Sequence, residues 1–474
     1  MTSQKITIEP VTRIEGHAKV TVHLNPDGSV AHAYFHVNEF RGFEKFCEGR
    51  LVTEMQQITP RICGICPVSH HLAAAKAGDV VLGCPPPRPA TLLRELMHMG
   101  QVIQSHGMHF FELGGPDLIL GFDHDPATRN VIGLVQADPE LTLKAIRLRK
   151  FGQSIISELG ERSIHPNFAI PGGVNRAFSA DSRDRLLSQI EEQIATIQIG
   201  IAIIKRWAEA NQEDVNKFAV FPTGYLGLVT PEQSLELYDG RIHLTGRDRS
   251  SWGEFDPHNY LGFIAEHGEP WPYLKFPYYK PLGFPEGVYR VGPLGRLNNS
   301  RQISTPLANA EFQNFKAINN GKPVENTLYY HYARMIETLF AAERARELLL
   351  DPDILSTDIL NTRQEPRGEG VGCIEAPRGT LIHHYQANAY GQLTKVNLIV
   401  STGHNNYAMS KAVDMVAKAY VHGPDVREGM LNRVEHAIRA HDPCLSCSTH
   451  AVGQMPLEIS IFDSDEQLIR TIRR

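Results

Sequence analysis

Hydrophobic and polar residues alternate near the start of the chain, and this pattern predicts a β-hairpin. Apolar side chains stand at positions 18, 20, 22 and 24, and again at positions 31, 33, 35 and 37. The turn-forming sequence Asn25-Pro-Asp-Gly28 separates the two runs. Because side chains of a strand point alternately to its two faces, each run would bury one face. The same reasoning predicts a second hairpin from residues 235–238 and 241–244 about Asp239-Gly240, and a short strand at residues 457–462.

Apolar residues at helical spacing predict that long helices make up most of the chain. The longest example runs from Asp181 to Trp207, where apolar residues recur at positions 186, 187, 190, 194, 197, 201 and 204. Stretches rich in proline and glycine, at residues 83–89 and 271–295, are typical of loops that wrap a bundle. We therefore expect a mainly α-helical bundle with peripheral β-hairpins. The predicted helices span residues 91–111, 181–207, 327–350 and 405–420.

The composition is that of a soluble globular protein. The chain has 474 residues, of which 42% are hydrophobic and 21% charged, and its formal net charge is −6. So small a charge argues against a protein that binds nucleic acid or anionic membranes electrostatically. The sequence shows no export signal, no apolar run long enough to span a bilayer, and no complete motif for binding ATP or a dinucleotide. We expect a cytoplasmic protein without direct membrane insertion.

Two C-x-x-C pairs at opposite ends of the chain give the strongest indication of chemistry. Cys63 and Cys66 lie near the start, and Cys444 and Cys447 near the end. Each pair can present two thiolates on one side of a tight turn, so a fold that joins the pairs makes a four-sulfur site for a soft or borderline metal. Cys66 and Cys444 are 378 positions apart. Small zinc units gather their ligands over much shorter distances, so this spacing favours a buried reaction centre.

The residues around both pairs predict that their thiols lie at helix N-termini. Pro67 is a favoured first helical residue, and Asp442 would cap a helix that carries Cys444 and Cys447 in its first turn. The helix dipole stabilises a thiolate at such a position.

Other cysteines and histidines leave alternatives open. His70 and His450 follow the two pairs and could be metal ligands, hydrogen-bond donors to sulfur, or bystanders. Cys47, Cys84 and Cys373 are interpreted as small buried hydrophobic residues. On the residues alone, a structural zinc site is favoured over a redox metal.

Both motifs belong to longer stretches that resemble the large subunit of nickel-iron hydrogenases. Arg61-x-Cys-Gly-x-Cys-x-x-x-His70 and Asp442-Pro-Cys-x-x-Cys-x-x-His450 are similar to the two signatures of that family. Similar stretches follow in the family's order over nearly the whole chain, and finer features resemble its cytoplasmic bidirectional, NAD-linked branch. The stretches are Pro10–His17, Phe40–Glu44, Ser105–Phe111 ahead of Asp117, and Glu375–Leu381; the branch features are Pro171–Val174, Arg290–Gly295 and Gly453–Pro456.

The resemblance implies a nickel ion held by all four thiolates, with Cys66 and Cys447 bridging to an iron that carries carbon monoxide and cyanide. This centre would split H2 reversibly and heterolytically into protons and electrons. Cys444 would accept the first proton, and Glu15 would accept it from Cys444. A carboxylate near buried sulfur has a raised pKa, which suits a proton relay. Without the resemblance, Glu15 would be interpreted as a surface or capping carboxylate.

The resemblance also assigns the surroundings of the iron. Arg378 would donate hydrogen bonds to its cyanide ligands, and Thr402 would supply a hydroxyl donor. Asp117 and Asp442 would orient Arg378, although each could instead cap a helix. We also count His70 among the residues around the centre. The chain departs from the family's commoner pattern at Ser401, a frequent proline, and at His404, a frequent tryptophan.

The resemblance also implies a second metal ion and the proteolytic removal of the C-terminal residues. Glu44, His450 and the backbone carbonyl of Leu398 would hold a magnesium-type ion. In this family a protease removes the residues after the second motif's histidine once nickel is bound. Residues 1–450 would then form the single domain of the mature subunit, and residues 451–474 would be the extension that is removed.

Electrons from H2 must leave the chain, and this requirement predicts partners. The three remaining cysteines are too few for an iron–sulfur cluster, so we expect an iron–sulfur small subunit. In the NAD-linked branch, diaphorase subunits with FMN would complete the route to NAD within a hetero-oligomer. The alternatives are a branch that uses NADP or a deazaflavin, a structural zinc subunit of a larger complex, and the non-catalytic core subunit of respiratory complex I. The presence of all four cysteines argues against the last.

Overall fold

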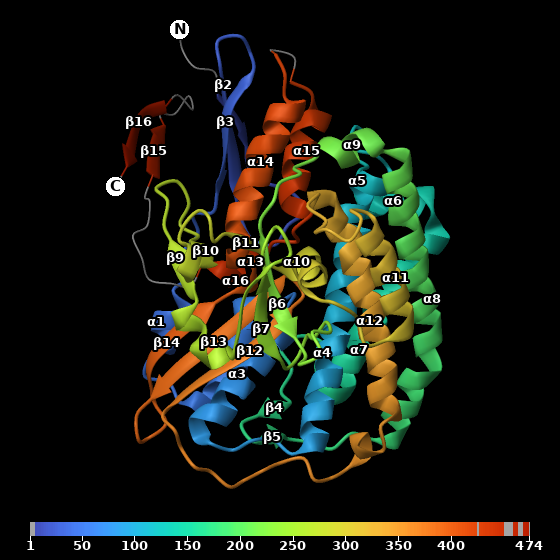
Figure 1. The fold of residues 1–474 in the computed structure, drawn as a ribbon, viewed down its shortest axis with the longest axis vertical. Coiled ribbons are helices and arrows are strands. Elements are labelled where there is room, and N and C mark those ends of the chain that lie inside the picture. The colour runs from blue at the N-terminus through green and yellow to red at the C-terminus, as the bar shows by residue number, and fades with distance from the viewer. Residues whose placement is uncertain (1–4, 424–425, 450–457, 463–467, 474) are drawn as a thin grey trace.

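The computed structural model describes residues 5–423, 426–449, 458–462 and 468–473. Long helices pack side by side on the right of Figure 1. Their buried leucine, isoleucine, alanine and phenylalanine side chains form the largest hydrophobic core. The mainly α-helical fold with peripheral hairpins is therefore confirmed. The bundle consists of α4 (Arg88–Met108), α7 (Pro139–Gly160), α8 (Ala180–Ala210), α11 (Pro306–Ala317) and α12 (Tyr330–Leu350).

All predicted helices are present, and local chemistry sets their ends. α8 begins where the Ser179 hydroxyl accepts a hydrogen bond from the backbone N–H of Ser182. α4 begins at Arg88 and so includes Pro89, which we expected in a loop, because proline fits the first turn of a helix. α7 was not predicted, although Asp138 caps it by accepting a hydrogen bond from the Leu141 N–H. The remaining helices are α1 (Phe43–Cys47), α2 (Met55–Ile58), α3 (Pro67–Leu82), α5 (Gly115–Ile119), α6 (Val131–Ala137), α9 (Gln212–Lys217), α10 (Gly292–Asn299), α13 (Ser401–His404), α14 (Asn406–Tyr420), α15 (Glu428–Arg439) and α16 (Leu445–Ser448).

The first predicted hairpin is confirmed as β2 (Lys19–Leu24) and β3 (Val30–His36). A further strand, β1 (Lys5–Ile8), pairs with β2 and completes a three-stranded antiparallel sheet. α14 packs against β3, and a second hydrophobic core lies between this sheet and α14 and α15. The sheet rises beside these helices in Figure 1.

The second predicted hairpin is wrong. Residues 241–244 do form a strand, β7 (Arg241–Thr245), but it pairs with β6 (Gly224–Val229) and β8 (Ser251–Phe255). Residues 235–238 are not available for pairing in this way, because the Glu236 side chain accepts hydrogen bonds from the N–H groups of Leu237 and Tyr238, at 2.8 Å each. The sheet is completed by β11 (Tyr289–Arg290), which pairs in parallel with β6.

A buried sheet that we did not predict lies next to α3. It is the antiparallel set β12 (Glu369–Ala376), β13 (Gly379–Ala387) and β14 (Leu393–Ile399). α3 packs across β12 and β13, so both faces of these strands are covered and their sequences lack simple alternation.

The segment at residues 271–295 is more regular than the predicted loop. It contains β10 (Phe276–Tyr279), which pairs with β9 (Ile264–His267), as well as β11 and the start of α10. β4 (Ala169–Ile170) and β5 (Gly173–Val174) form another short pair. The predicted strand near the C-terminus is β15 (Glu458–Phe462), which pairs with β16 (Leu468–Arg473); Leu457 lies outside the described residues.

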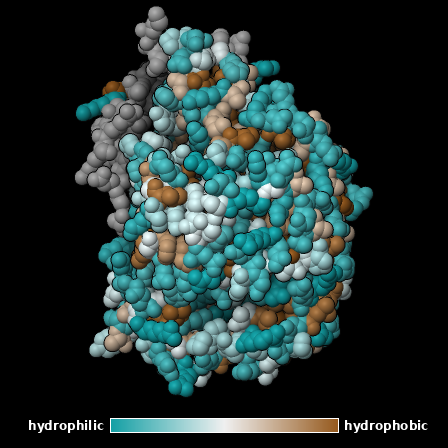
Figure 2. Space-filling model, in the orientation of Figure 1, coloured by the Kyte–Doolittle hydropathy of each residue, from teal (hydrophilic) through white to brown (hydrophobic). Residues whose placement is uncertain are grey.

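The surface and the helices agree with the polar composition. The face in Figure 2 is largely hydrophilic, with hydrophobic residues scattered over it. Among the helices in the described parts of the chain, none has the length and apolar character needed to cross a membrane.

Candidate metal centre

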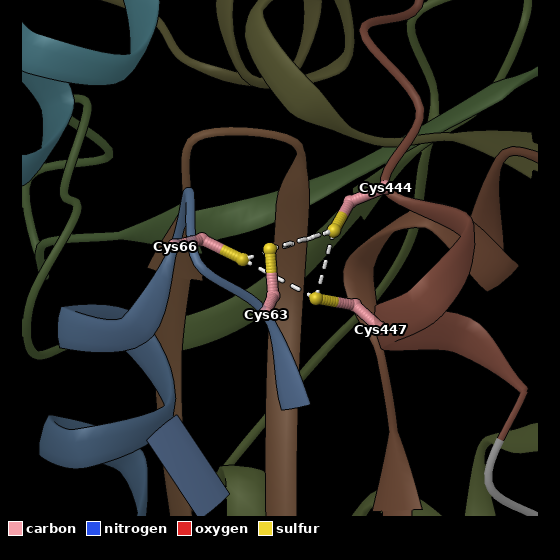
Figure 3. Close-up of side chains that lie close together, drawn as sticks. All are labelled: Cys63, Cys66, Cys444 and Cys447. Atoms are coloured by element: carbon pink, nitrogen blue, oxygen red, sulfur yellow. Dashed lines mark hydrogen bonds between the residues drawn. The ribbon is translucent and has the colours of Figure 1, made fainter. Parts of the chain in front are cut away.

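Four cysteine sulfurs from the two ends of the chain meet in the interior and point toward one another (Figure 3). Sγ of Cys444 lies 3.2 Å from Sγ of Cys63 and 2.8 Å from Sγ of Cys447. Sγ of Cys66 lies 3.3 Å from Sγ of Cys447, and all four sulfurs fall within 4.8 Å of one another. None of these residues is more than 4% exposed. The fold thus joins the two C-x-x-C pairs into the four-sulfur site predicted from the sequence.

Different local structures hold the two pairs. As predicted, Cys66 stands at the N-cap of α3, directly before Pro67. At the other pair, the prediction that Asp442 caps the helix is wrong, because Cys444 occupies the N-cap of α16. Asp442 adopts a left-handed backbone conformation, with φ 55°, and its side chain binds Arg378 instead. The turn at Asp442 sets the direction in which Cys444 enters the site.

The sulfurs differ in how readily they lose a proton. Hydrogen bonds from Cys444, Cys447 and Cys66 lower the pKa of the Cys63 thiol well below its ordinary value. Burial raises the pKa of the Cys444 and Cys447 thiols. A bound cation would reverse this, because a coordinating thiol is deprotonated outright. The site is therefore built for a cation, which removes the cost of burying several thiolates together.

Glu15 lies directly against the second cysteine pair. Its Oε2 accepts a hydrogen bond from the Cys444 thiol at 3.1 Å and another from the backbone N–H of Ser446 at 3.0 Å. The Glu15 backbone carbonyl also accepts from the N–H of Leu445 at 3.1 Å. The residue is half-buried. Its carboxylate can therefore exchange a proton with the sulfur of Cys444.

Arg378 is buried beside the sulfurs and is held by Asp442. Its Nη2 donates to Oδ1 of Asp442 at 2.9 Å, and its Nη1 lies 3.5 Å from the hydroxyl of Ser105. Burial opposes its charge, but Asp442 and the sulfurs of Cys444 and Cys66 keep the pKa of the guanidinium above its ordinary value. Nε of Arg378 and Oδ2 of Asp442 are buried and have no hydrogen-bond partner among the described residues. These two atoms can therefore form hydrogen bonds with a further ligand beside the sulfurs.

Thr402 also reaches the site. Its hydroxyl oxygen accepts a hydrogen bond from the backbone N–H of Cys444 at 2.9 Å, which leaves its proton available to a ligand. His404, where the commoner family pattern has tryptophan, is buried and its Nδ1 lies 2.7 Å from the Tyr289 hydroxyl. Burial lowers the pKa of His404 to about 3, so it is neutral at pH 7.

Asp117 does not lie against Arg378. Its carboxylate accepts hydrogen bonds from Arg13, Arg439 and His436, and its pKa is held well below the usual range by these groups although burial acts in the opposite direction. Arg378 is not among its hydrogen-bond partners in the described part of the chain, so the predicted orientation of Arg378 by Asp117 would have to act through other residues. Sequence reasoning missed Ser105 as the second neighbour of Arg378, and only its place in the Ser105–Phe111 stretch could have indicated it.

The structure describes two of the three residues implied to hold a second ion. Oε1 of Glu44 lies 2.7 Å from the backbone N–H of Leu398, and burial raises the pKa of Glu44. These two residues therefore meet, whereas His450 lies outside the described residues. His70 is buried in α3, and its Nδ1 lies 3.0 Å from Nε2 of His383. Burial lowers the pKa of His70 to about 4.

Comparison with known proteins assigns the family. Residues 5–40 match a family described as HoxL-like, and residues 41–130 and 245–450 match the family described as nickel-dependent hydrogenase. The chain belongs to the nickel-dependent hydrogenases. Within that family it is a large subunit, as predicted. NAD-reducing hydrogenase HoxS subunit beta of Cupriavidus necator is 43% identical to this hydrogenase chain, over 98% of the chain and 99% of the relative.

Other relatives support the same assignment. An F420-non-reducing hydrogenase subunit of Methanothermobacter thermautotrophicus is 42% identical over 99% of this chain and 100% of the relative. The crystal structure of an NAD+-reducing NiFe-hydrogenase in the H2-reduced state is 44% identical and superposes with a TM-score of 0.92, over 95% of this chain and 100% of that chain. A NiFeSe-hydrogenase of Dm. baculatum, 22% identical, shares the fold with a TM-score of 0.76 over 95% of this chain and 100% of that chain.

The donor set of this hydrogenase fits a nickel-iron centre. Four soft sulfur donors suit nickel and low-spin iron, and they lie close enough for one compact centre. Charged Arg378 and the hydroxyl of Thr402 both border the sulfurs, where they can meet anionic ligands of an iron.

Proposed function

We propose that this hydrogenase chain is the catalytic subunit that splits H2 reversibly and heterolytically into protons and electrons. The observation that carries the proposal is the contact between the Glu15 carboxylate and the Cys444 thiol, 3.1 Å apart, inside a buried four-sulfur site. A structural zinc site can be built from four sulfurs, but it has no use for a proton acceptor beside one of them.

In this proposal the sulfurs of Cys63, Cys66, Cys444 and Cys447 would hold the nickel and the iron. When bound, the nickel-iron centre supplies the two-electron chemistry that breaks the H–H bond. The sulfur of Cys444 accepts one proton and transfers it to Oε2 of Glu15, and the half-buried carboxylate passes it toward solvent. Two protons and two electrons leave for each H2 consumed.

Arg378 and Thr402 bind the cyanide ligands of the iron, which also carries carbon monoxide. A planar guanidinium suits an anionic acceptor in a dry pocket, and Asp442 fixes its orientation at 2.9 Å. Asp117 supports the site from a distance through Arg13 and Arg439.

Glu44, the Leu398 carbonyl and His450 are proposed to hold a magnesium-type ion. The contact between Glu44 and the backbone of Leu398 supports this assignment. A hard ion with oxygen ligands and water would also account for a half-buried carboxylate at that position.

Electrons pass to an iron–sulfur subunit, and from there to NAD through diaphorase subunits with FMN. The relative named as NAD-reducing and the superposed NAD+-reducing structure support this acceptor. The second candidate is a branch that uses NADP or a deazaflavin. Relatives named F420-non-reducing are nearly as similar as the NAD-reducing one, but because F420 is a deazaflavin, their name gives no support to a deazaflavin acceptor. Reduction of each acceptor by the purified complex under H2 decides between them.

The proposal is tested by metal analysis together with infrared spectroscopy. We expect about one nickel and one iron per chain, and stretching bands of carbon monoxide and cyanide. Cys447→Ser should lose these bands, whereas Cys373→Ser, which changes an equally buried cysteine outside the site, should keep them. Zinc as the only metal would overturn the proposal.

Residues 451–474 are proposed to be a maturation extension. Chains that retain it should contain little nickel or an incomplete centre, because in this proposal the extension is removed once nickel has been inserted. Mass spectrometry of the intact protein, combined with nickel analysis of chains with and without residues 451–474, tests this proposal. A complete centre in chains with an unbroken bond between residues 450 and 451 would refute it.

A further inference from the structure

Arg378 stands at the tip of a tight hairpin in the buried sheet. β12 and β13 pair up to Ala376 and Gly379, so Pro377 and Arg378 alone form the turn. Gly379 has φ 140°, and a Cβ there would lie 2.2 Å from a side-chain atom of Val291. The turn is therefore pressed against the residues that precede α10, which lies between α12 and the sheets in Figure 1.

Arg296, on α10, binds the strand end that leads into this turn. Its Nη1 donates to Oε2 of Glu375 at 2.7 Å and to the carbonyl of Ala376 at 3.0 Å, and its Nη2 donates to the carbonyl of Pro377 at 3.2 Å. Three consecutive residues before Arg378 are thus held by one guanidinium. Arg296 is 1% exposed, so water cannot replace these contacts.

Glu337, on α12, fixes Arg296 and connects it to the other neighbour of Arg378. Its carboxylate accepts hydrogen bonds from Nε and Nη2 of Arg296, at 2.6 Å each, and its Oε2 lies 3.1 Å from Nε2 of His106. His106 follows Ser105 on α4, and the Ser105 hydroxyl is the neighbour of Nη1 of Arg378. Glu337 therefore connects Arg296, which holds the strand end before Arg378, with α4, which carries the Ser105 neighbour of Arg378.

Stability alone does not explain this cluster. A buried ion network is often no more stable than hydrophobic residues of the same volume, whereas the planar fork of arginine fixes directions. The contacts of Arg296 go to Glu337 and to the segment that leads into Arg378. We propose that Arg296 and Glu337 are positioning residues that set the direction of the Arg378 guanidinium toward the metal centre. This inference rests on the proposed role of Arg378 at the cyanide ligands.

The test uses the purified holoenzyme with Glu337→Gln, which keeps the shape of the side chain and removes its charge. We expect the cyanide stretching bands to shift and kcat to fall roughly 10- to 100-fold, the cost of a small misplacement. Nickel and iron content and the KM for H2 should stay unchanged. Thr380→Val is a milder variant that removes only the hydrogen bond from the Thr380 hydroxyl to Glu375, at 2.6 Å. The cyanide bands of Thr380→Val should shift in the same direction as those of Glu337→Gln, but by less. If Glu337→Gln does not fold, Thr380→Val alone tests the inference.

Asp79→Asn is the matched control, because Asp79 also binds a buried arginine, Arg94, through two hydrogen bonds. Arg94 also donates to the carbonyls of Ile170 and Gly173 and interacts with Tyr238, and none of these is a hydrogen-bond partner of Arg378 among the described residues. This variant should therefore lower Tm while leaving the bands and kcat unchanged. Wild-type bands and kcat in metal-loaded Glu337→Gln and Thr380→Val would overturn the inference. A wild-type enzyme without cyanide bands would overturn the proposed function, and the inference with it.

Discussion

Among individual residues, Glu15 shows most directly how the fold places chemistry, because one carboxylate oxygen contacts both the Cys444 thiol and the backbone N–H of Ser446. The backbone contact holds the carboxylate in place, and the contact with sulfur gives it a proton to exchange. The residue is half-buried, so it borders both the interior and the surface.

Glu15→Gln should stop proton transfer while the site remains intact. The amide oxygen can still accept the hydrogen bond from Ser446, but the amide cannot take up a proton, so H2-dependent dye reduction should fall by roughly 100- to 10,000-fold. Nickel and iron content should not change. Glu213→Gln alters an exposed carboxylate on α9 and should retain normal turnover. A Glu15→Gln enzyme with both metals and wild-type activity would contradict the proposed relay.

At the scale of elements, the site depends on close packing between the segment around Glu15 and the short helix α16. The Glu15 backbone carbonyl accepts a hydrogen bond from the Leu445 N–H, which forms a bridge between the two chain ends. Gly16 makes this approach possible. It has φ 82°, and a Cβ there would lie 2.8 Å from Cβ of Leu445.

Gly16→Ala should therefore separate Glu15 from Cys444. We expect a loss of unfolding free energy of about 1 to 2 kcal/mol from the left-handed backbone conformation, and a larger relative loss of H2 turnover, roughly tenfold or more. Thermal unfolding and H2-dependent dye reduction measure the two effects. Gly49→Ala is the control, because Gly49 also has a positive φ, 83°, but a Cβ there would meet nothing within 4 Å. Equal activity in the two variants would argue against the proposed importance of this contact.

At the scale of the whole molecule, the interior holds many uncharged histidines. Burial lowers the pKa of His71 to about 4, and that of His98 and His441 to about 3. Each must remain neutral in the folded protein. In the unfolded chain each would take up a proton near the ordinary pKa of about 6.5.

Stability should consequently fall as the pH drops from about 6.5 toward 4, because the unfolded state binds more protons over this range. Each such histidine contributes a slope of about 1.4 kcal/mol per pH unit. Tm measured from pH 7 to pH 5 should show this decline, and His98→Leu should make it shallower. A Tm independent of pH would contradict the explanation.

Much of the site was predictable because its residues lie in short local motifs. Cys63, Cys66, Cys444 and Cys447 are recognisable by spacing, and Pro67 indicates the helix that presents the first pair. The long helices and the first hairpin were predictable because their hydrophobic periods persist over many residues. Where burial covers both faces, as in β12 and β13, the period disappears and the strands were missed.

The sequence by itself determined which residue types carry the chemistry and the regular elements that present them, since both are properties of neighbouring positions. Tertiary structure alone decided which distant groups meet: Asp117 with Arg439 and not with Arg378, β7 with β6 and not with residues 235–238, and Arg296 with the turn before Arg378. The physical reason is that a buried charge or a strand edge must be satisfied by some partner, but the fold as a whole determines which partner is within reach.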